Sequence, residues 1–363
     1  MDHGLYVHVP FCARKCPYCA FFSVPLRDDP LREWLAGVDR ELSSLPHAFR
    51  PSSVFFGGGT PTALPDDALS RLLDSVRSRV DLSLLSEWSC EANPGTLSPS
   101  KARILRQAGV NRLSLGAQSL DDASLRLLGR IHSAADVRSC VALARDAGFS
   151  NLGLDLIYGL PGRPDASFLS DLDAALDLAP DHLSCYCLEI EDATPFARRA
   201  AQGRLPVSAD SQRNLFDSLR ARLSQRGWIH YEISNFARPG RECRHNLLYW
   251  TGGEYVGVGP SAHSHWNGVR YANDARLPSW SVAFRERLDP EAKARETFVM
   301  GLRRTAGWNR AEFLAATGFD YDALRGPEIA RLAADGLLAV SPDRVRLADS
   351  ALFVSDPVFA ELV

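Results

Sequence analysis

Three cysteines near the start of the chain have a spacing that suits an iron–sulfur cluster. They read Cys12-x-x-x-Cys16-x-x-Cys19. Four cysteines occupy every iron of a cubane [4Fe–4S] cluster, so three leave one iron open. The alternatives are a zinc site or three buried thiols. Zinc usually takes paired CxxC units with a second pair or histidines further on. Cys185-Tyr186-Cys187 is too tight for such a pair, so the spacing favours the cluster.

An iron with an open position can chelate the amino and carboxylate groups of S-adenosyl-L-methionine (SAM). One electron from the cluster can then cleave the sulfonium and release a 5′-deoxyadenosyl radical. In such chemistry the cofactor reacts, and the protein supplies position and excludes water.

Composition describes an ordinary globular chain of 363 residues, with 45% hydrophobic residues, 23% charged residues and a net charge of −3. This balance does not favour nucleic acid as a partner. No run reaches the roughly 18 to 20 apolar residues of a membrane helix, and the N-terminus lacks a signal-peptide pattern. We therefore expect a cytoplasmic protein. The five scattered cysteines, more typical of buried apolar positions, are Cys90, Cys140, Cys185, Cys187 and Cys243.

The first ~240 residues alternate strand and helix patterns, which predicts a parallel sheet with helical crossovers. Leu69, Leu72, Leu73 and Val76 follow the spacing of one buried helix face. Ser98-Pro99 is a helix start and Gly109 a helix end, and Gly148 ends a helix over 134–147. The predicted strands are 5–9, 53–56, 88–91, 113–115, 152–158 and 182–190.

Polar residues and glycines follow several of these strands. Gly57 to Pro61 comes after one strand, Glu91 ends the next, Gln118 follows a third, and Asp155 lies within a fourth. The carboxyl ends of parallel strands meet at one edge, in an open sheet and in a barrel alike. Periodicity alone does not separate these two folds, but both bring the four segments together.

The alternation of strand and helix patterns does not continue into the C-terminal part of the chain. Residues 291–304, 310–316 and 326–335 read as helices, and 337–340 with 344–347 as a hairpin. This order predicts a small α+β module of winged-helix type.

One long segment carries a family resemblance. Tyr6-Val-His-Val-Pro-Phe-Cys12-Ala-Arg-Lys-Cys16-Pro-Tyr-Cys19 resembles the opening of the oxygen-independent coproporphyrinogen III oxidase-like radical SAM family, and the likeness continues over about residues 5–265. It implies an α/β fold: a partial (β/α)6 barrel carrying the [4Fe–4S] and SAM sites over 1–265, and a small C-terminal domain over 266–363.

The resemblance also implies the SAM contacts. A glycine segment lets backbone approach a ligand closely, an arginine can pair with the methionine carboxylate, and an acid on an apolar strand is unusual in a core. A paired structural aspartate is the alternative for Asp155. The positions that match the family's SAM contacts are Tyr6, Gly58, Gly59, Thr60, Glu91, Gln118, Arg130 and Asp155.

Two branches of this family differ in function. The oxidase branch resembles CxxxCxxCxC and carries an extension before the motif. Here Phe21 stands at the position of the fourth cysteine, and eleven residues precede Cys12. Both features favour the HemW-type heme-chaperone branch and argue against coproporphyrinogen oxidase activity.

The segment His245-Asn246-Leu247-Leu248-Tyr249-Trp250 matches the HNxxYW signature of the chaperone branch. Neutral imidazole can ligate heme iron, so the resemblance implies His245 as a heme ligand. Cys243, His263 and His265 are second choices. The alternative is a loop in which His245 and Asn246 satisfy backbone groups and the aromatic residues fill a core.

Three functions remain after this reading. The first is a heme chaperone that delivers heme to acceptor hemoproteins such as cytochromes. The second is oxygen-independent coproporphyrinogen III dehydrogenation, and the third is another radical SAM modification such as methyl transfer. Phe21 counts against the second and the HNxxYW segment against the third. The resemblance also implies an electron donor for the cluster and a homodimer.

Overall fold

The computed structural model describes residues 2–363. Within them, twelve strands form one curved sheet in the order β14-β13-β12-β11-β1-β4-β5-β6-β7-β8-β10-β9. β14 and β9 stand at its edges, so the sheet is open, as expected of a partial barrel. The strands are β1 (His3–Val9), β4 (Ser53–Gly58), β5 (Glu87–Ala92), β6 (Arg112–Gln118), β7 (Leu152–Tyr158), β8 (His182–Cys187), β9 (Ile229–Glu232), β10 (Asn235–Ala237), β11 (Glu254–Val258), β12 (His263–Trp266), β13 (Val269–Asn273) and β14 (Val282–Arg287).

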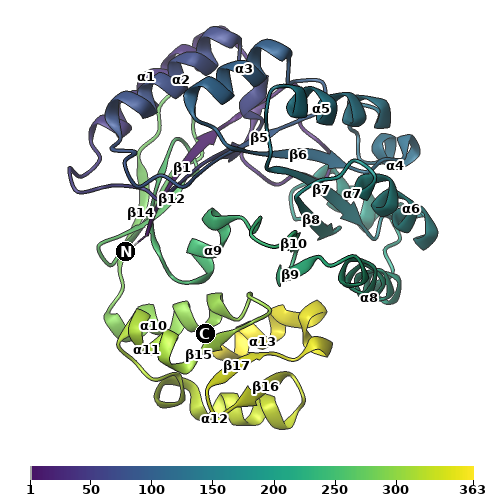
Figure 1. The fold of residues 1–363 in the computed structure, drawn as a ribbon, viewed down its shortest axis with the longest axis vertical. Coiled ribbons are helices and arrows are strands. Elements are labelled where there is room, and N and C mark those ends of the chain that lie inside the picture. Colours follow the sequence, from purple (N-terminus) through teal and green to yellow (C-terminus); the bar gives the residue numbers. More distant parts are fainter. Residues whose placement is uncertain (1) are drawn as a thin grey trace.

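Strands β1 and β4 to β8 run parallel in chain order, and this confirms the predicted parallel sheet with crossovers. The crossover helices cover the convex side of the sheet (Figure 1). These helices, with α8 after β8, are α1 (Asp28–Ser43), α2 (Asp66–Arg79), α3 (Pro99–Ala108), α4 (Asp122–Leu127), α5 (Ala134–Asp146), α6 (Asp165–Leu176) and α8 (Ala209–Gln225).

Local signals set the helix boundaries. The Ser98 hydroxyl accepts a hydrogen bond from the Lys101 backbone N–H at 3.2 Å, and Gly109 ends α3 at φ 110°. On α2, Leu69, Leu72 and Val76 are fully buried. A helix whose apolar face is buried this way gains most of its stability from packing against the sheet.

The sheet continues beyond the predicted domain boundary at 265/266. That boundary falls inside β12, and β13 and β14 extend the same sheet to Arg287. The pairing of these strands favours a boundary between Arg287 and Pro290, where α10 (Pro290–Gly301) begins.

Among the described residues, the C-terminal domain has four α-helices and a three-stranded antiparallel sheet in the order β15-β17-β16. The predicted hairpin is confirmed as β16 (Leu338–Ser341) and β17 (Arg344–Leu347), beside β15 (Trp308–Asn309). The helices are α10, α11 (Arg310–Thr317) and α12 (Tyr321–Ala334), followed by η2 (Asp349–Val354) and α13 (Ser355–Leu362). This domain lies opposite the concave side of the main sheet (Figure 1). No helix among residues 2–363 is long and apolar enough to cross a membrane.

Candidate functional site

The cysteine loop lies above the carboxyl ends of the parallel strands. It begins at Cys12, the last residue of the short strand β2 (Phe11–Cys12), which pairs with β3 (Val24–Pro25). The Phe196 backbone N–H at the start of α7 (Pro195–Ala201) donates to the Pro17 carbonyl at 3.0 Å. The loop is therefore fixed at both its entry and its middle.

The glycine segment packs directly beneath the start of the cysteine loop. Gly59 N–H donates to the Val9 carbonyl and Thr60 N–H to the Phe11 carbonyl, both at 2.8 Å. A Cβ on Gly59 would lie 2.6 Å from the Phe11 carbonyl oxygen, and one on Gly58 would lie 2.4 Å from the His8 ring. Gly58 also has φ 104°, which side chains rarely adopt. Both positions therefore need glycine.

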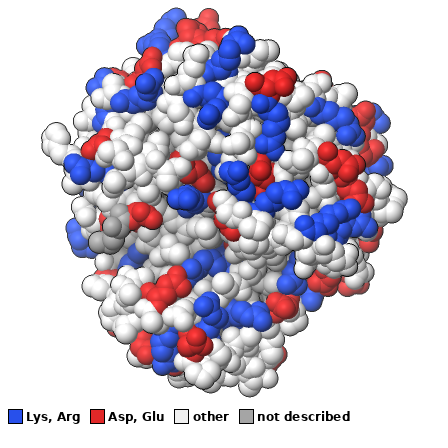
Figure 2. Space-filling model, in the orientation of Figure 1, with Lys and Arg blue, Asp and Glu red and all other residues white. Residues whose placement is uncertain are grey.

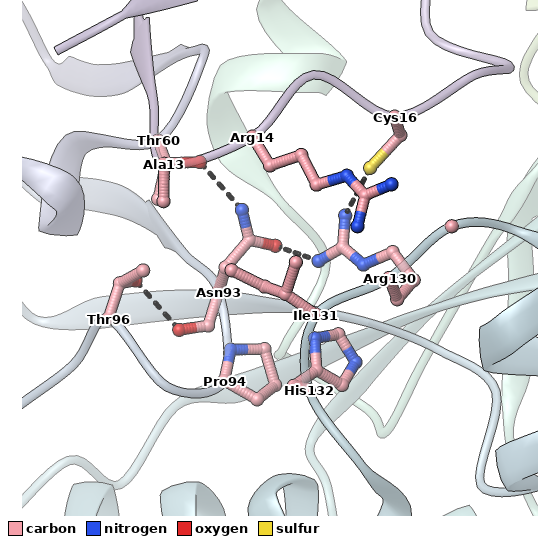
Figure 3. Close-up of a pocket in the computed structure, with 11 residues that line it drawn as sticks. Ala13, Arg14, Cys16, Thr60, Asn93, Pro94, Thr96, Arg130, Ile131 and His132 are labelled. Atoms are coloured by element: carbon pink, nitrogen blue, oxygen red, sulfur yellow. Dashed lines mark hydrogen bonds between the residues drawn. The ribbon is translucent and has the colours of Figure 1, made fainter.

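Arg130 connects the cysteine loop to the sheet (Figure 3). Its Nη1 donates to Cys16 Sγ at 3.4 Å, while Nη2 donates to Asn93 Oδ1 and to the Gly116 carbonyl at 2.9 Å. Asn93 Nδ2 in turn donates to Thr60 Oγ1 at 2.6 Å. Arg130 thus links Cys16 through Asn93 to Thr60 of the glycine segment.

Glu91, near the end of β5, and Asp155, in the middle of β7, are two half-buried acids that border the same cavity. Burial, and next the charge of Asp155, raise the pKa of Glu91 to about 8. Burial also raises the pKa of Asp155, although hydrogen bonds from Ser184 and Ser114 oppose the shift. Acids with raised pKa values in a cavity are typical of functional sites.

Of the two remaining predicted SAM contacts, Gln118 borders the cavity and Tyr6 does not. Gln118 adopts φ 65° at a register shift between β6 and β7, and this strained backbone turns its side chain into the cavity. The Tyr6 hydroxyl bonds to His8 Nδ1 at 3.1 Å, and His8 Nε2 bonds to the Phe22 carbonyl at 2.9 Å. Through His8, Tyr6 thus supports the backbone at Phe22, three residues after Cys19. Tyr6 is not among the residues that border the cavity.

A cavity of about 670 Å³ joins these residues to the C-terminal domain. Figure 2 shows the corresponding face hollowed between the upper and lower parts of the molecule, with basic and acidic side chains at the rim. Phe21 is 69% exposed and borders this cavity. The predicted site residues that border it are Cys12, Cys16, Cys19, Gly58, Gly59, Thr60, Glu91, Gln118, Arg130 and Asp155.

The HNxxYW segment lies against the amino ends of β4 and β5, whereas the cysteine loop lies near the carboxyl ends of the parallel strands. It forms helix α9 (Arg244–Trp250), whose backbone N–H groups at Arg244 and His245 donate to Glu87, the first residue of β5. His245 Nδ1 bonds to Ser53 Oγ at 2.9 Å and Nε2 to the Tyr249 hydroxyl at 2.8 Å. The ring is 1% exposed, and burial lowers its pKa to about 3. Both ring nitrogens are therefore engaged within the protein.

The second-choice heme ligands are also separate from the cavity. Cys243 is fully buried, and its thiol donates to Glu87 at 3.4 Å. His265 is 5% exposed and bonds through Nδ1 to Lys293 Nζ at 2.9 Å, whereas His263 is exposed at the start of β12.

The cysteines fit a cluster in the chemistry of their donors. Three thiols border one cavity, together with Gly58, Gly59 and Thr60 of the glycine segment. Among residues 2–363, no three His, Cys, Asp or Glu side chains converge on a single ion. A cubane does not require such convergence, because each thiolate binds a different iron.

Several residues of the cavity wall were not predicted from the sequence, among them Asn93, Tyr186 and Arg303. Asn93 comes one residue after β5 and could have been found as the polar residue in Cys-Glu-Ala-Asn-Pro-Gly. Tyr186, 44% exposed at the end of β8, and Arg303, contributed by the C-terminal domain, carry no local signal. Only the tertiary structure places them at the cavity.

Comparisons with known proteins agree with this architecture. Residues 6–175 match the radical SAM superfamily and residues 288–354 the HemN C-terminal domain. The chain is 34% identical to the Bacillus subtilis (strain 168) protein named "Heme chaperone HemW" over 98% of this chain and 97% of that protein. It is 36% identical to the Escherichia coli (strain K12) protein of the same name, over 94% and 92% of the two chains.

The chain belongs to the HemW family of radical SAM proteins. This membership implies SAM and a [4Fe–4S] cluster as cofactors. The solved structure of coproporphyrinogen III oxidase (HemN) from Escherichia coli matches 99% of this chain and 90% of that one, with a TM-score of 0.85 at 24% identity. That likeness confirms the radical SAM fold with its C-terminal domain. The match to the HemN C-terminal domain begins at residue 288, directly after β14.

Proposed function

We propose that this protein is a heme chaperone, which binds heme and delivers it to acceptor hemoproteins. The observation that carries the proposal is the similarity, over nearly the whole chain, to proteins named heme chaperone HemW. A cavity with both apolar and charged walls, between the parallel strands and the C-terminal domain, supports it. So does Phe21, which stands where the oxidase-like pattern has a fourth cysteine.

We assign the cluster to Cys12, Cys16 and Cys19, and SAM to the polar residues beside them. A bound cluster would supply electrons and an open iron for SAM. Arg130 holds the loop through Cys16 and has a charge that suits a carboxylate. Gly58, Gly59 and Thr60 bring backbone close to the ligand, while Glu91, Gln118 and Asp155 offer polar groups for its amino and ribose parts. Tyr6 acts through His8, below the loop.

His245 remains a predicted heme ligand. For its Nε2 or Nδ1 to reach an iron, α9 must move away from β4, because the ring now bonds to Ser53 and Tyr249. The arrangement agrees with the other reading of the motif, in which a buried histidine satisfies its neighbours. The two readings separate in His245→Ala, as described in the Discussion.

Oxygen-independent coproporphyrinogen III dehydrogenation is the second candidate, and the shared HemN fold is the observation that favours it. Fold alone does not carry an activity. Turnover must therefore be measured beside heme binding.

The test is a heme titration of anaerobically reconstituted protein, followed by its Soret absorbance, with coproporphyrinogen III turnover measured on the same samples. We expect one heme per chain and no turnover. Cys16→Ser should lose iron and sulfide, whereas the control Cys140→Ser, in the buried side of α5, should keep both. Turnover without specific heme binding would replace the proposal with the oxidase function.

Three further properties are proposed from resemblance to the family. They are a cytoplasmic location, an electron donor that reduces the cluster, and a homodimer. Size measurement by light scattering, with and without the cluster, tests the dimer.

A further inference from the structure

Arg303 lies where the two domains meet. It follows the end of α10, and its side chain borders the cavity. The backbone around it is fixed to the core: Ile233 N–H donates to the Arg303 carbonyl at 3.1 Å, and Thr305 N–H donates to the Tyr231 carbonyl at 3.2 Å. The guanidinium therefore has a defined position relative to both domains.

The guanidinium is held from one side, with hydrogen-bonding capacity left over. Its Cζ lies 4.6 Å over the Trp250 ring, a cation–π distance. Its nearest carboxylate, Glu232, is 3.9 Å away, and Nε has no hydrogen-bond partner within residues 2–363. Arginine carries five N–H donors in a fork that suits a carboxylate. Nε is buried, but the side chain is 26% exposed and borders the cavity, so the terminal Nη groups are the donors available to a ligand there.

The neighbouring cavity wall carries apolar side chains beside its charged ones. Phe216, Ile233, Leu352 and Phe353 border it, together with the exposed Tyr186. The cavity of about 670 Å³ extends from the cysteine loop to the C-terminal domain, and heme is assigned to the part that Arg303 borders. A flat apolar ligand with carboxylates at one edge fits such a wall.

The acidic residues of the cavity favour one orientation of a ligand that carries carboxylates. Glu189 and Asp356 also border it. A ligand carboxylate is repelled from these two and attracted to Arg303. Burial raises the pKa of Glu189, and the nearby charge of Arg303 opposes that shift.

We propose that heme binds in this cavity and that Arg303 receives one of its propionates. This inference rests on the proposed function and names the binding site for it.

The HNxxYW segment supports Arg303 through Trp250. His245 and Tyr249 bond to each other, and His245 bonds to Ser53, which fixes α9 against the sheet. Trp250, the last residue of α9, then supports the Arg303 guanidinium. Trp250 is thus a positioning residue for a propionate-binding arginine.

The experiment compares heme with iron protoporphyrin IX dimethyl ester, whose propionates carry no charge. Both are titrated into cluster-loaded protein and followed by Soret absorbance. Loss of a charge-assisted hydrogen bond costs about tenfold or more in affinity. We expect the ester to bind the wild type about tenfold more weakly than heme, and Arg303→Gln to bind heme and ester with similar, weakened affinity.

Variants around Arg303 separate positioning from folding. Trp250→Leu should weaken heme binding and reduce the preference for heme over the ester, whereas Trp250→Phe should restore both, because a phenyl ring still supports the cation. Arg331→Gln removes the same charge from an exposed position of the C-terminal domain and should bind like the wild type.

The results distinguish the inference from the function on which it rests. A wild type that binds no heme contradicts the proposed function. A wild type that binds heme and ester equally overturns the inference and leaves the function standing, as does an Arg303→Gln variant that keeps the full preference for heme. The comparison of ligands on the wild type decides the point even where a variant fails to fold.

Discussion

Replacement of Glu91 by glutamine should make the protein more stable at alkaline pH. The carboxyl group of Glu91 ionises near its ordinary pKa of 4.5 in the unfolded chain, whereas burial and the charge of Asp155 raise its pKa to about 8 in the fold. Between these two values, unfolding releases a proton, so a rise in pH favours the unfolded chain. Glutamine has the same shape but does not ionise.

The magnitude follows from the proton released. Each pH unit within this window changes the free energy of unfolding by about 1.4 kcal/mol. From pH 6 to pH 8, wild type should therefore lose up to about 3 kcal/mol relative to Glu91→Gln. Water in the neighbouring cavity screens the charge, so this value is an upper limit.

The assay is urea unfolding of the cluster-free protein at pH 6, 7 and 8. The difference between variant and wild type should widen with pH. Asp39→Asn is the control, because Arg79 hydrogen bonds lower the pKa of Asp39 and so move its titration further from the assayed pH range. A difference for Glu91→Gln that stays flat or narrows as the pH rises would refute the reasoning.

The same variant should bind SAM more weakly in the cluster-loaded protein, measured by isothermal titration calorimetry. A residue that lowers stability but improves ligand binding is characteristic of a functional site. Unchanged SAM affinity would show that Glu91 does not contact SAM.

Three further changes test the fold around the site. Gly59→Ala forces a Cβ against two backbone carbonyls. It should lower the free energy of unfolding by about 1–3 kcal/mol, measured by thermal unfolding, and lower the iron content. The control Gly326→Ala, whose Cβ meets nothing closer than 3.9 Å, should do neither. Ser98→Ala removes the α3 cap and should cost about 1 kcal/mol in urea unfolding with iron content unchanged; an unchanged urea midpoint would mean that the cap contributes nothing. His245→Ala leaves the Ser53 hydroxyl unpaired and should cost about 1–3 kcal/mol in urea unfolding. Loss of heme binding at unchanged stability would instead mark His245 as a ligand.

Sequence patterns predicted those parts of the fold that depend on local periodicity. The strand over 152–158 has its predicted bounds, and the 344–347 strand of the C-terminal hairpin does too. Helix α3 begins and ends at its predicted cap residues, because a capping hydroxyl and a glycine at positive φ act locally. The winged-helix type of the C-terminal domain followed from the order of such elements.

Non-local pairing was beyond the same patterns. The extension of the sheet through β13 and β14 depends on partners far away in sequence, and these short strands have mixed polarity. Residues 244–250 were read as a signature or a loop, whereas they form a helix that Glu87 of β5 caps. Periodicity cannot reveal a cap from another element.

The candidate site divides in the same way. Residues at and near the carboxyl ends of parallel strands were predicted to come together because these ends share one edge. Glu91, Gln118 and Asp155, the last of them within its strand, do border one cavity. Arg303 could not be predicted, because its place depends on how the C-terminal domain docks on β9. Cluster and SAM binding by these residues stay predictions until the cofactors are measured.

Heme delivery is the central claim, and the most direct measurement is transfer to an acceptor. The protein is loaded with one heme, mixed with an apo-cytochrome b under reducing, anaerobic conditions, and followed by the shift of the Soret band to that of the cytochrome. The account predicts that heme appears in the cytochrome in proportion to the loaded protein, and that an excess of apo-myoglobin as a scavenger for free heme does not suppress the transfer. Heme that stays bound, or that reaches the cytochrome only through the free pool, would contradict it.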